Sequence, residues 1–75
     1  MNRIGVKSTN LVSVGYDFAS HTLEVEFRKG QVYHYFEVPE YIYDGLLSAT
    51  SAGVYFQVHI KERFMYRIVQ EEKTS

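Results

Sequence analysis

Two tyrosines near a pair of cations are the residues whose types and spacing best suit binding chemistry. Tyr33 and Tyr35 follow Arg28 and Lys29 closely in the chain. Aromatic rings exposed on a sheet can stack unpaired bases, at about 1–3 kcal/mol per base, and Arg and Lys side chains bind phosphate. We therefore hypothesise a site for RNA or another single-stranded nucleic acid. The alternative is that both rings pack over the preceding strand as the rim of the core, with only their hydroxyls in water.

A second group of basic and aromatic residues lies near the C-terminal end. Lys61, Arg63 and Arg67 are interleaved with Phe64 and Tyr66. Such mixtures can bind nucleic acid, so the three cations are included in the hypothetical site. They also follow a predicted helix, whose C-terminal end favours cations without any ligand.

The remaining polar residues form no recognisable catalytic or metal-binding pattern. The chain has no cysteine, and His21, His34 and His59 are too scattered for a metal motif. Its serines lack a nucleophile elbow, and its glycines do not form a phosphate-binding loop. We expect a protein that is not an enzyme and that holds no metal and no cofactor.

Length and charge narrow the class of protein further. Seventy-five residues make one domain. A domain this short buries only about 60% of its unfolded surface, so we expect it to gain stability as a homodimer. No apolar run approaches the roughly 18 residues of a membrane span, and the expected location is the cytoplasm. The net charge is −1, with basic residues gathered at both ends, which argues against non-specific DNA binding.

The hydropathy pattern predicts a single α+β domain over residues 10–69. Apolar and polar residues alternate between residues 10 and 38, which indicates three antiparallel strands joined by short turns. Residues 64–69 form either a fourth strand or an extended arm. The expected architecture is a three-stranded, or four-stranded, antiparallel meander packed against two short C-terminal helices. Residues 1–9 and 70–75 are expected to be a flexible arm and a flexible tail.

The turn between the second and third of these strands decides which side chains meet. A two-residue turn requires positive φ at Lys29, which is unfavourable for a lysine. A three-residue loop, residues 28–30, requires it only at Gly30, where it costs little. We favour the three-residue loop. It sets Tyr33 opposite Val25 and Tyr35 opposite Leu23, so both tyrosines face the core, and a slip of one residue would turn both away.

Helix signals follow in the second half of the chain. Pro39 predicts the first turn of a helix, and Ile42, Leu46 and Ala49 form its apolar stripe, with Tyr43 and Leu47 beside it. Gly45 weakens this helix by about 1 kcal/mol relative to alanine, which suggests close packing against the sheet. Ser51 is a suitable N-cap for a second helix, which carries Phe56 and Ile60 one turn apart.

The opposite face of the sheet is predicted to carry Val32, His34 and Phe36. Exposed apolar side chains on a small sheet suggest a partner surface, so we assign these three residues to a homodimer interface. The alternative is that the C-terminal segment covers them within one chain.

The spacing of these residues resembles the KTSC domain family. The resemblance rests on Leu23-x-Val25-x-Phe27-x-x-Gly30, Tyr33-His34-Tyr35, Val38-Pro39, Leu46-Leu47-x-Ala49-x-Ser51-x-Gly53-x-Tyr55-Phe56 and Ile60, and it runs from about Ser8 to Phe64. Gln57 stands where the family commonly has asparagine. The family occurs at the C-terminus of some lysyl-tRNA synthetases and as short bacterial proteins. The resemblance therefore implies a small binding module for RNA, or alternatively a protein-interaction or homodimerisation domain without nucleic-acid affinity.

Overall fold

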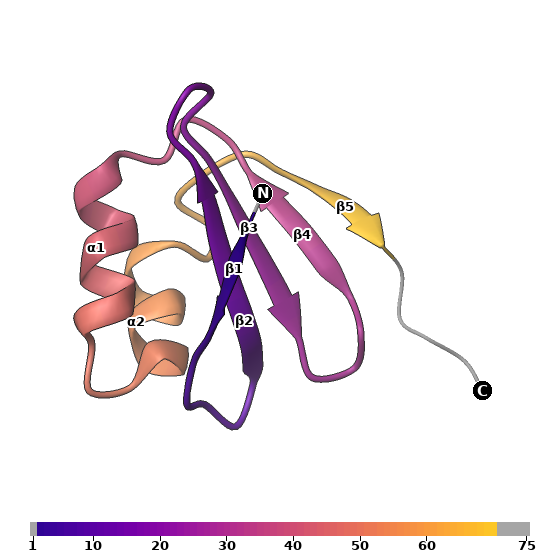
Figure 1. Cartoon of the computed structure of the whole chain (residues 1–75), viewed down its shortest axis with the longest axis vertical. Helices are drawn as coiled ribbons and strands as arrows, with labels where there is room; N and C mark the ends of the chain where they lie inside the picture. The colour runs from indigo at the N-terminus through magenta and orange to yellow at the C-terminus, as the bar shows by residue number, and fades with distance from the viewer. Residues whose placement is uncertain (1, 71–75) are drawn as a thin grey trace.

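The computed structural model describes residues 2–70. It consists of a five-stranded antiparallel sheet with two helices on one of its faces (Figure 1). The strands lie in the sheet in their order along the chain, so every connection joins neighbouring strands, including the one from β4 to β5 that contains the two helices. The elements are β1 (Arg3–Gly5), β2 (Leu11–Asp17), β3 (Thr22–Phe27), β4 (Val32–Tyr35), α1 (Glu40–Ser48), α2 (Ala52–His59) and β5 (Tyr66–Gln70).

The sheet has more strands than the three or four predicted from the sequence. Residues 3–5, which were predicted to lie in a flexible arm, form β1 and pair with β2, with Ile4 opposite Val14. This strand is too short to show an alternating pattern, and only its pairing with β2 defines it. The segment left open between strand and arm forms β5, which includes Gln70 from the predicted tail. Residues 71–75 of that tail lie outside the described residues.

The loop between β3 and β4 has the predicted three-residue form. The amide of Phe27 donates to the carbonyl oxygen of Gln31 at 2.8 Å, which closes the loop around residues 28–30. Gly30 takes a φ of 95°, the conformation that required a glycine. Tyr35 accordingly lies opposite Leu23, and Tyr33 lies opposite Val25, as the three-residue loop requires. Both tyrosines therefore face the helices.

The two helices begin where the sequence predicted. Pro39 occupies the N-cap position of α1, and the Ser51 hydroxyl caps α2 by accepting a hydrogen bond from the Val54 amide at 3.3 Å. The buried side of α1 differs slightly from the predicted stripe, because Tyr43 and Leu46 carry it and Ala49 already lies beyond the helix end. Over residues 2–70, no helix has both the length and the apolar character that crossing a membrane requires.

Gly45 permits a close approach between the two helices rather than between helix and sheet. A Cβ atom at this position would lie 2.6 Å from Cζ of Tyr55, well inside van der Waals contact. The predicted contact between Gly45 and the sheet is therefore wrong, although the glycine does allow close packing. The Tyr55 ring occupies the space that any larger residue at position 45 would need.

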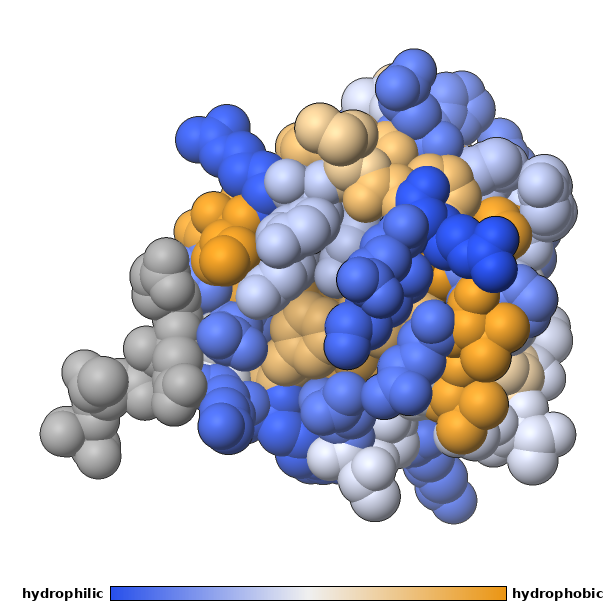
Figure 2. Space-filling view, turned by 180° about the vertical axis from the view of Figure 1, so that it is seen from behind, coloured by the Kyte–Doolittle hydropathy of each residue, from blue (hydrophilic) through white to orange (hydrophobic). Residues whose placement is uncertain are grey.

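The core lies between the sheet and the helices. It contains residues from β2, β3, β4, α1 and α2, together with Val38 and Ile60 from the connections. Its fully buried side chains are Leu11, Val14, Leu23, Val25, Val38, Leu46 and Ile60. Other apolar side chains stay exposed, on α2 and in β5. Figure 2 shows the molecule from behind, with hydrophobic patches on either side of a hollow. Apolar surface is visible in this hollow, between hydrophilic side chains.

Candidate nucleic-acid interface

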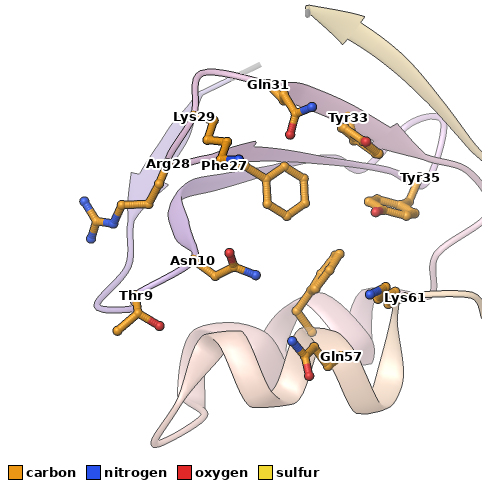
Figure 3. Close-up of a pocket in the computed structure, with 11 residues that line it drawn as sticks. Thr9, Asn10, Phe27, Arg28, Lys29, Gln31, Tyr33, Tyr35, Gln57 and Lys61 are labelled. Carbon is orange, nitrogen blue, oxygen red and sulfur yellow. The ribbon is translucent and has the colours of Figure 1, made fainter. Parts of the chain in front are cut away.

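A pocket of about 470 Å³ lies between the β3–β4 hairpin, the β1–β2 loop and α2 (Figure 3). Its size falls within the range of about 300–1,000 Å³ that is typical of small-molecule sites. Aromatic, basic and amide side chains share the lining. The lining residues are Thr9, Asn10, Phe27, Arg28, Lys29, Gln31, Tyr33, Tyr35, Phe56, Gln57 and Lys61.

Aromatic rings form the wall of the pocket on the sheet side. Phe27, Tyr33 and Tyr35 come from β3 and β4, and the ring of Phe56 reaches up from α2 to meet them. Phe56 lies edge-on to Phe27 and to Tyr35, at centroid distances of 5.5 and 5.6 Å. Tyr33 lies edge-on to Phe27 at 5.1 Å and stacks with Tyr35 at 6.1 Å. The wall is thus a continuous aromatic surface held by the register of the hairpin.

The two tyrosines play different parts in this wall. Tyr35 is only 4% exposed and belongs to the core, whereas Tyr33 is partly exposed and packs against that core from outside. Burial raises the pKa of Tyr35 above its usual value, and the neighbouring Tyr33 and Tyr66 raise it further. The Tyr35 hydroxyl therefore remains protonated at neutral pH. This arrangement is compatible with both interpretations of the pair, as part of the core and as a binding surface. Tyr35 packs in the core, whereas Tyr33 offers ring surface to a ligand.

We expect the stability of the domain to fall above about pH 10. The pKa of Tyr35 is higher in the native state than in the unfolded chain, where it is about 10. Its contribution to stability is therefore fully present below about pH 10. That contribution is lost as pH rises from the unfolded pKa through the native one. The loss per such tyrosine is at most about 1.4 kcal/mol per pH unit. Urea unfolding between pH 8 and pH 11 measures it. Tyr35→Phe should flatten the decline, whereas Tyr41→Phe, which removes an exposed hydroxyl, should leave it; equal slopes in all three proteins would contradict the assignment.

The charged groups of the pocket are all cations. Arg28, Lys29 and Lys61 line it, and the lining within the described part of the chain contains no carboxylate. Arg28 points away from the centre of the pocket in Figure 3, and its Nη2 donates to the carbonyl oxygen of Ser8 at 2.7 Å. Lys29 and Lys61 approach the pocket from opposite sides, one from the hairpin and one from the end of α2. A ligand with negative charge on an aromatic body matches this lining.

The structure brings together five of the seven residues that the sequence placed in a nucleic-acid site. Tyr33, Tyr35, Arg28, Lys29 and Lys61 all line the pocket. The other two do not line it. Arg63 lies in the turn after α2, and Arg67 pairs in register with His34 on the opposite face of the sheet.

Six residues that line the pocket were not predicted from the sequence to belong to the site. Phe27 and Gln31 flank the three-residue loop, so the predicted register already placed them near Tyr33. Phe56 was predicted only as an apolar helix residue. Thr9, Asn10 and Gln57 reach the pocket from a loop and a helix that are distant in the chain, and no local pattern marks them.

The helix-free face of the sheet is polar, in contrast to the predicted apolar dimer surface. Arg3 on β1 lies 3.3 Å from a carboxylate oxygen of Glu24 and 3.6 Å from one of Glu26. Nε2 of His34 donates to the same Glu24 side chain at 2.7 Å, and Ser13 donates to Glu26 at 2.8 Å. These contacts form a hydrogen-bonded and ionic network across four strands.

The three residues assigned to a dimer interface have different surroundings in this face. Val32 is only 6% exposed, because it lies between Glu26 on β3 and Gln70 on β5, whose side chains flank it on the sheet. This burial within one chain corrects the expectation that Val32 is available to a partner. His34 is engaged with Glu24, and Phe36 stays exposed. Self-association as a homodimer stays a prediction.

Within residues 2–70, no three histidine or carboxylate side chains gather closely enough to hold a metal ion. The three histidines belong to separate neighbourhoods: His21 lies beside Tyr16, His34 beside Glu24, and His59 beside Tyr55.

Comparisons with known proteins agree on the family. The model of the KTSC domain matches residues 7–64. An uncharacterized protein of Stutzerimonas stutzeri is 40% identical over 67 residues, which cover 88% of this chain and 94% of that protein. The lysine–tRNA ligase of Trichormus variabilis is 43% identical over 51 residues, which cover 68% of this chain but only 9% of the ligase. The crystal structure of a KTSC domain protein from Yersinia pestis superposes with a TM-score of 0.89 at 36% identity, over 92% of this chain and 97% of that one. The chain therefore belongs to the KTSC domain family.

Proposed function

We propose that this domain binds single-stranded nucleic acid, RNA in the first place, with one base in the pocket between the hairpin and α2. The observation that carries the proposal is the composition of the pocket: a continuous aromatic wall and three cations, with no carboxylate among the described lining residues. Nucleic acid combines flat aromatic bases with phosphate charge, and the lining offers a complement to each.

The pocket offers stacking surface, hydrogen-bonding groups and a suitable volume for an unpaired base. The partly exposed ring of Tyr33 and the edge-on ring of Phe27 provide surface against which a base can stack. The side-chain amides of Asn10, Gln31 and Gln57 can each donate and accept hydrogen bonds at the edges of a base. The volume of about 470 Å³ accommodates a single base rather than a duplex.

The cations would hold the phosphates next to that base. Lys29 and Lys61 are exposed and stand on opposite sides of the pocket, and among residues 2–70 neither forms a salt bridge, so each can meet a phosphate. Arg28 already donates to a backbone carbonyl, yet an arginine has further N–H groups to offer. The net charge of −1 indicates that binding depends on these local groups, because the molecule as a whole does not attract phosphate.

The choice of RNA rests on the relatives. A region similar to this domain forms part of proteins named lysine–tRNA ligases, which act on RNA. The match covers 9% of each ligase, so the catalytic activity of those enzymes is not carried over. The role proposed for the domain is non-enzymatic binding.

Neutralising Lys29 and Lys61 together should weaken binding and reduce its dependence on salt. Each phosphate contact to a single strand contributes about 0.7 to the slope of log K against log salt concentration, so Lys29→Gln/Lys61→Gln should lower the slope by about 1.4. Fluorescence anisotropy with a labelled single-stranded tetra-adenylate RNA, over a series of salt concentrations, measures the effect.

The matched control removes the same net charge elsewhere. Lys7→Gln/Arg67→Gln changes two cations that do not line the pocket, so the slope should remain close to that of the original protein. Equal slopes in the two double variants would show that binding, if it occurs, is not anchored at the pocket. NMR titration of labelled protein should in parallel place the shifted amides in the hairpin and α2.

A further inference from the structure

The aromatic wall of the pocket continues beyond the helices onto the open part of the sheet. In β5, Ile68 lies opposite Tyr33 and Tyr66 lies opposite Tyr35, so these two β5 side chains share the face that forms the pocket wall. Figure 1 shows β5 at the edge of the sheet farthest from α1 and α2. Nothing among the described residues covers this part of the face, and all five residues of β5 are exposed.

Tyr66 extends the wall by one more ring. It stacks with Tyr33 at a centroid distance of 5.2 Å and an angle of 17°, and it also contacts Tyr35 at 5.7 Å. Tyr66 is nevertheless 55% exposed. A tyrosine that only sealed the rim of the core would bury most of its ring, whereas this one keeps aromatic surface open beside a pocket residue.

We propose that Tyr66 is a second stacking position, so that the domain takes at least two successive nucleotides of a single strand. This inference rests on the proposed function. One base occupies the pocket beside Tyr33, and the next lies on Tyr66 at the β5 edge of the sheet. Lys61, which lines the pocket, and Arg63, in the turn that leads to β5, precede Tyr66 by five and three residues, so two exposed cations lie close to it in the chain.

The ligand implied is an unpaired oligonucleotide rather than a free nucleotide. A mononucleotide would be satisfied by the pocket alone and would leave Tyr66 without a partner. A duplex would bury its bases and could reach neither position. The length of the ligand is therefore the variable that separates this proposal from simple binding in the pocket.

The test compares Tyr66→Ala with Tyr66→Phe against two probes, adenosine monophosphate and single-stranded tetra-adenylate RNA. Loss of one stacking position should weaken tetra-adenylate binding by about five-fold to 150-fold. Binding of the monophosphate should change less than about two-fold. Tyr66→Phe keeps the ring and should retain the affinity of the original protein for both. Tyr41→Ala, which removes a 72% exposed tyrosine from α1, is the matched control and should affect neither probe.

The outcomes separate this inference from the proposed function. If tetra-adenylate binds and the pocket variant Lys29→Gln/Lys61→Gln weakens it while Tyr66→Ala does not, the second position is wrong and the pocket stands. If Tyr66→Ala weakens both probes equally, Tyr66 acts by supporting the pocket, and the second position is again wrong. If neither probe binds the original protein, the proposed function and this inference both fail. Amide spectra of each variant establish that the sheet is intact.

Discussion

Replacing Phe56 with alanine is expected to lower the free energy of unfolding by about 3–5 kcal/mol. The side chain is 3% exposed and lies between Phe27 and Tyr35, where it joins α2 to the sheet. Its removal takes away the burial of a large ring, two edge-on aromatic contacts and the support of the pocket wall. A domain of this length has a total stability of roughly 4–11 kcal/mol, so this one change removes a large share of it.

Urea denaturation followed by circular dichroism measures this loss. Phe56→Leu, which keeps much of the buried volume, should cost clearly less than Phe56→Ala. Val58→Ala is the control on the same helix: Val58 is 51% exposed, and its truncation should stay within about 0.5 kcal/mol. If Phe56→Ala were as mild as Val58→Ala, α2 would not be anchored to the sheet through this ring. The aromatic wall of the pocket would then lack its lower support.

Replacing Tyr16 with alanine should cost about as much, roughly 3–5 kcal/mol, for a different combination of reasons. The ring stacks with Tyr43 of α1 at 5.0 Å and lies edge-on to Phe18 at 4.9 Å. Its hydroxyl donates to the carbonyl oxygen of Val38 and lies 3.0 Å from Nδ1 of His21. This single side chain thus connects β2 to α1 and to the segment that leads into it.

Tyr16→Phe separates the hydroxyl from the ring. It keeps the stacking but leaves the buried carbonyl of Val38 without that donor, which should cost about 1–3 kcal/mol. Thermal and urea unfolding of both variants give the two contributions by difference. Tyr41→Phe removes a hydroxyl that is exposed on α1 and should be neutral. A Tyr16→Phe variant as stable as the original protein would mean that water replaces the donor to Val38, and the connection would then depend on the ring alone.

The part of the candidate site that the sequence predicted is the part made by neighbours in the chain. The need for positive φ at one position selected Gly30 and the three-residue loop, and this loop set Tyr33 and Tyr35 on the core face. The N-cap at Ser51 followed equally from a local hydrogen bond. Arg28 and Lys29 belong to the same loop, so their position beside the tyrosines required no tertiary information.

Other features depended on contacts between distant segments and had no local signal. β1 exists because its backbone finds a partner in β2, since three residues are too few to show a period. Gly45 accommodates Tyr55 of the other helix, a contact that the apolar stripe of α1 does not reveal. Val32 was predicted to be exposed, but it is buried because β5 pairs with β4 beside it.

By itself the sequence determined the α+β class, the hairpin register and the two helix starts, because each depends on dihedral preferences and periodicities within a short stretch of chain. It also indicated the family, through the resemblance of its motifs between about Ser8 and Phe64. Only the tertiary structure decided that Gln57 on α2 and Lys61 in the turn after α2 line one pocket with Lys29 and Tyr33 of the hairpin, and that Arg67 lies on the other side of the sheet. The physical reason is that a pocket consists of the space between elements. Its lining is set by how the helices pack on the sheet, through rings such as Phe56, and no pattern within one element encodes that packing.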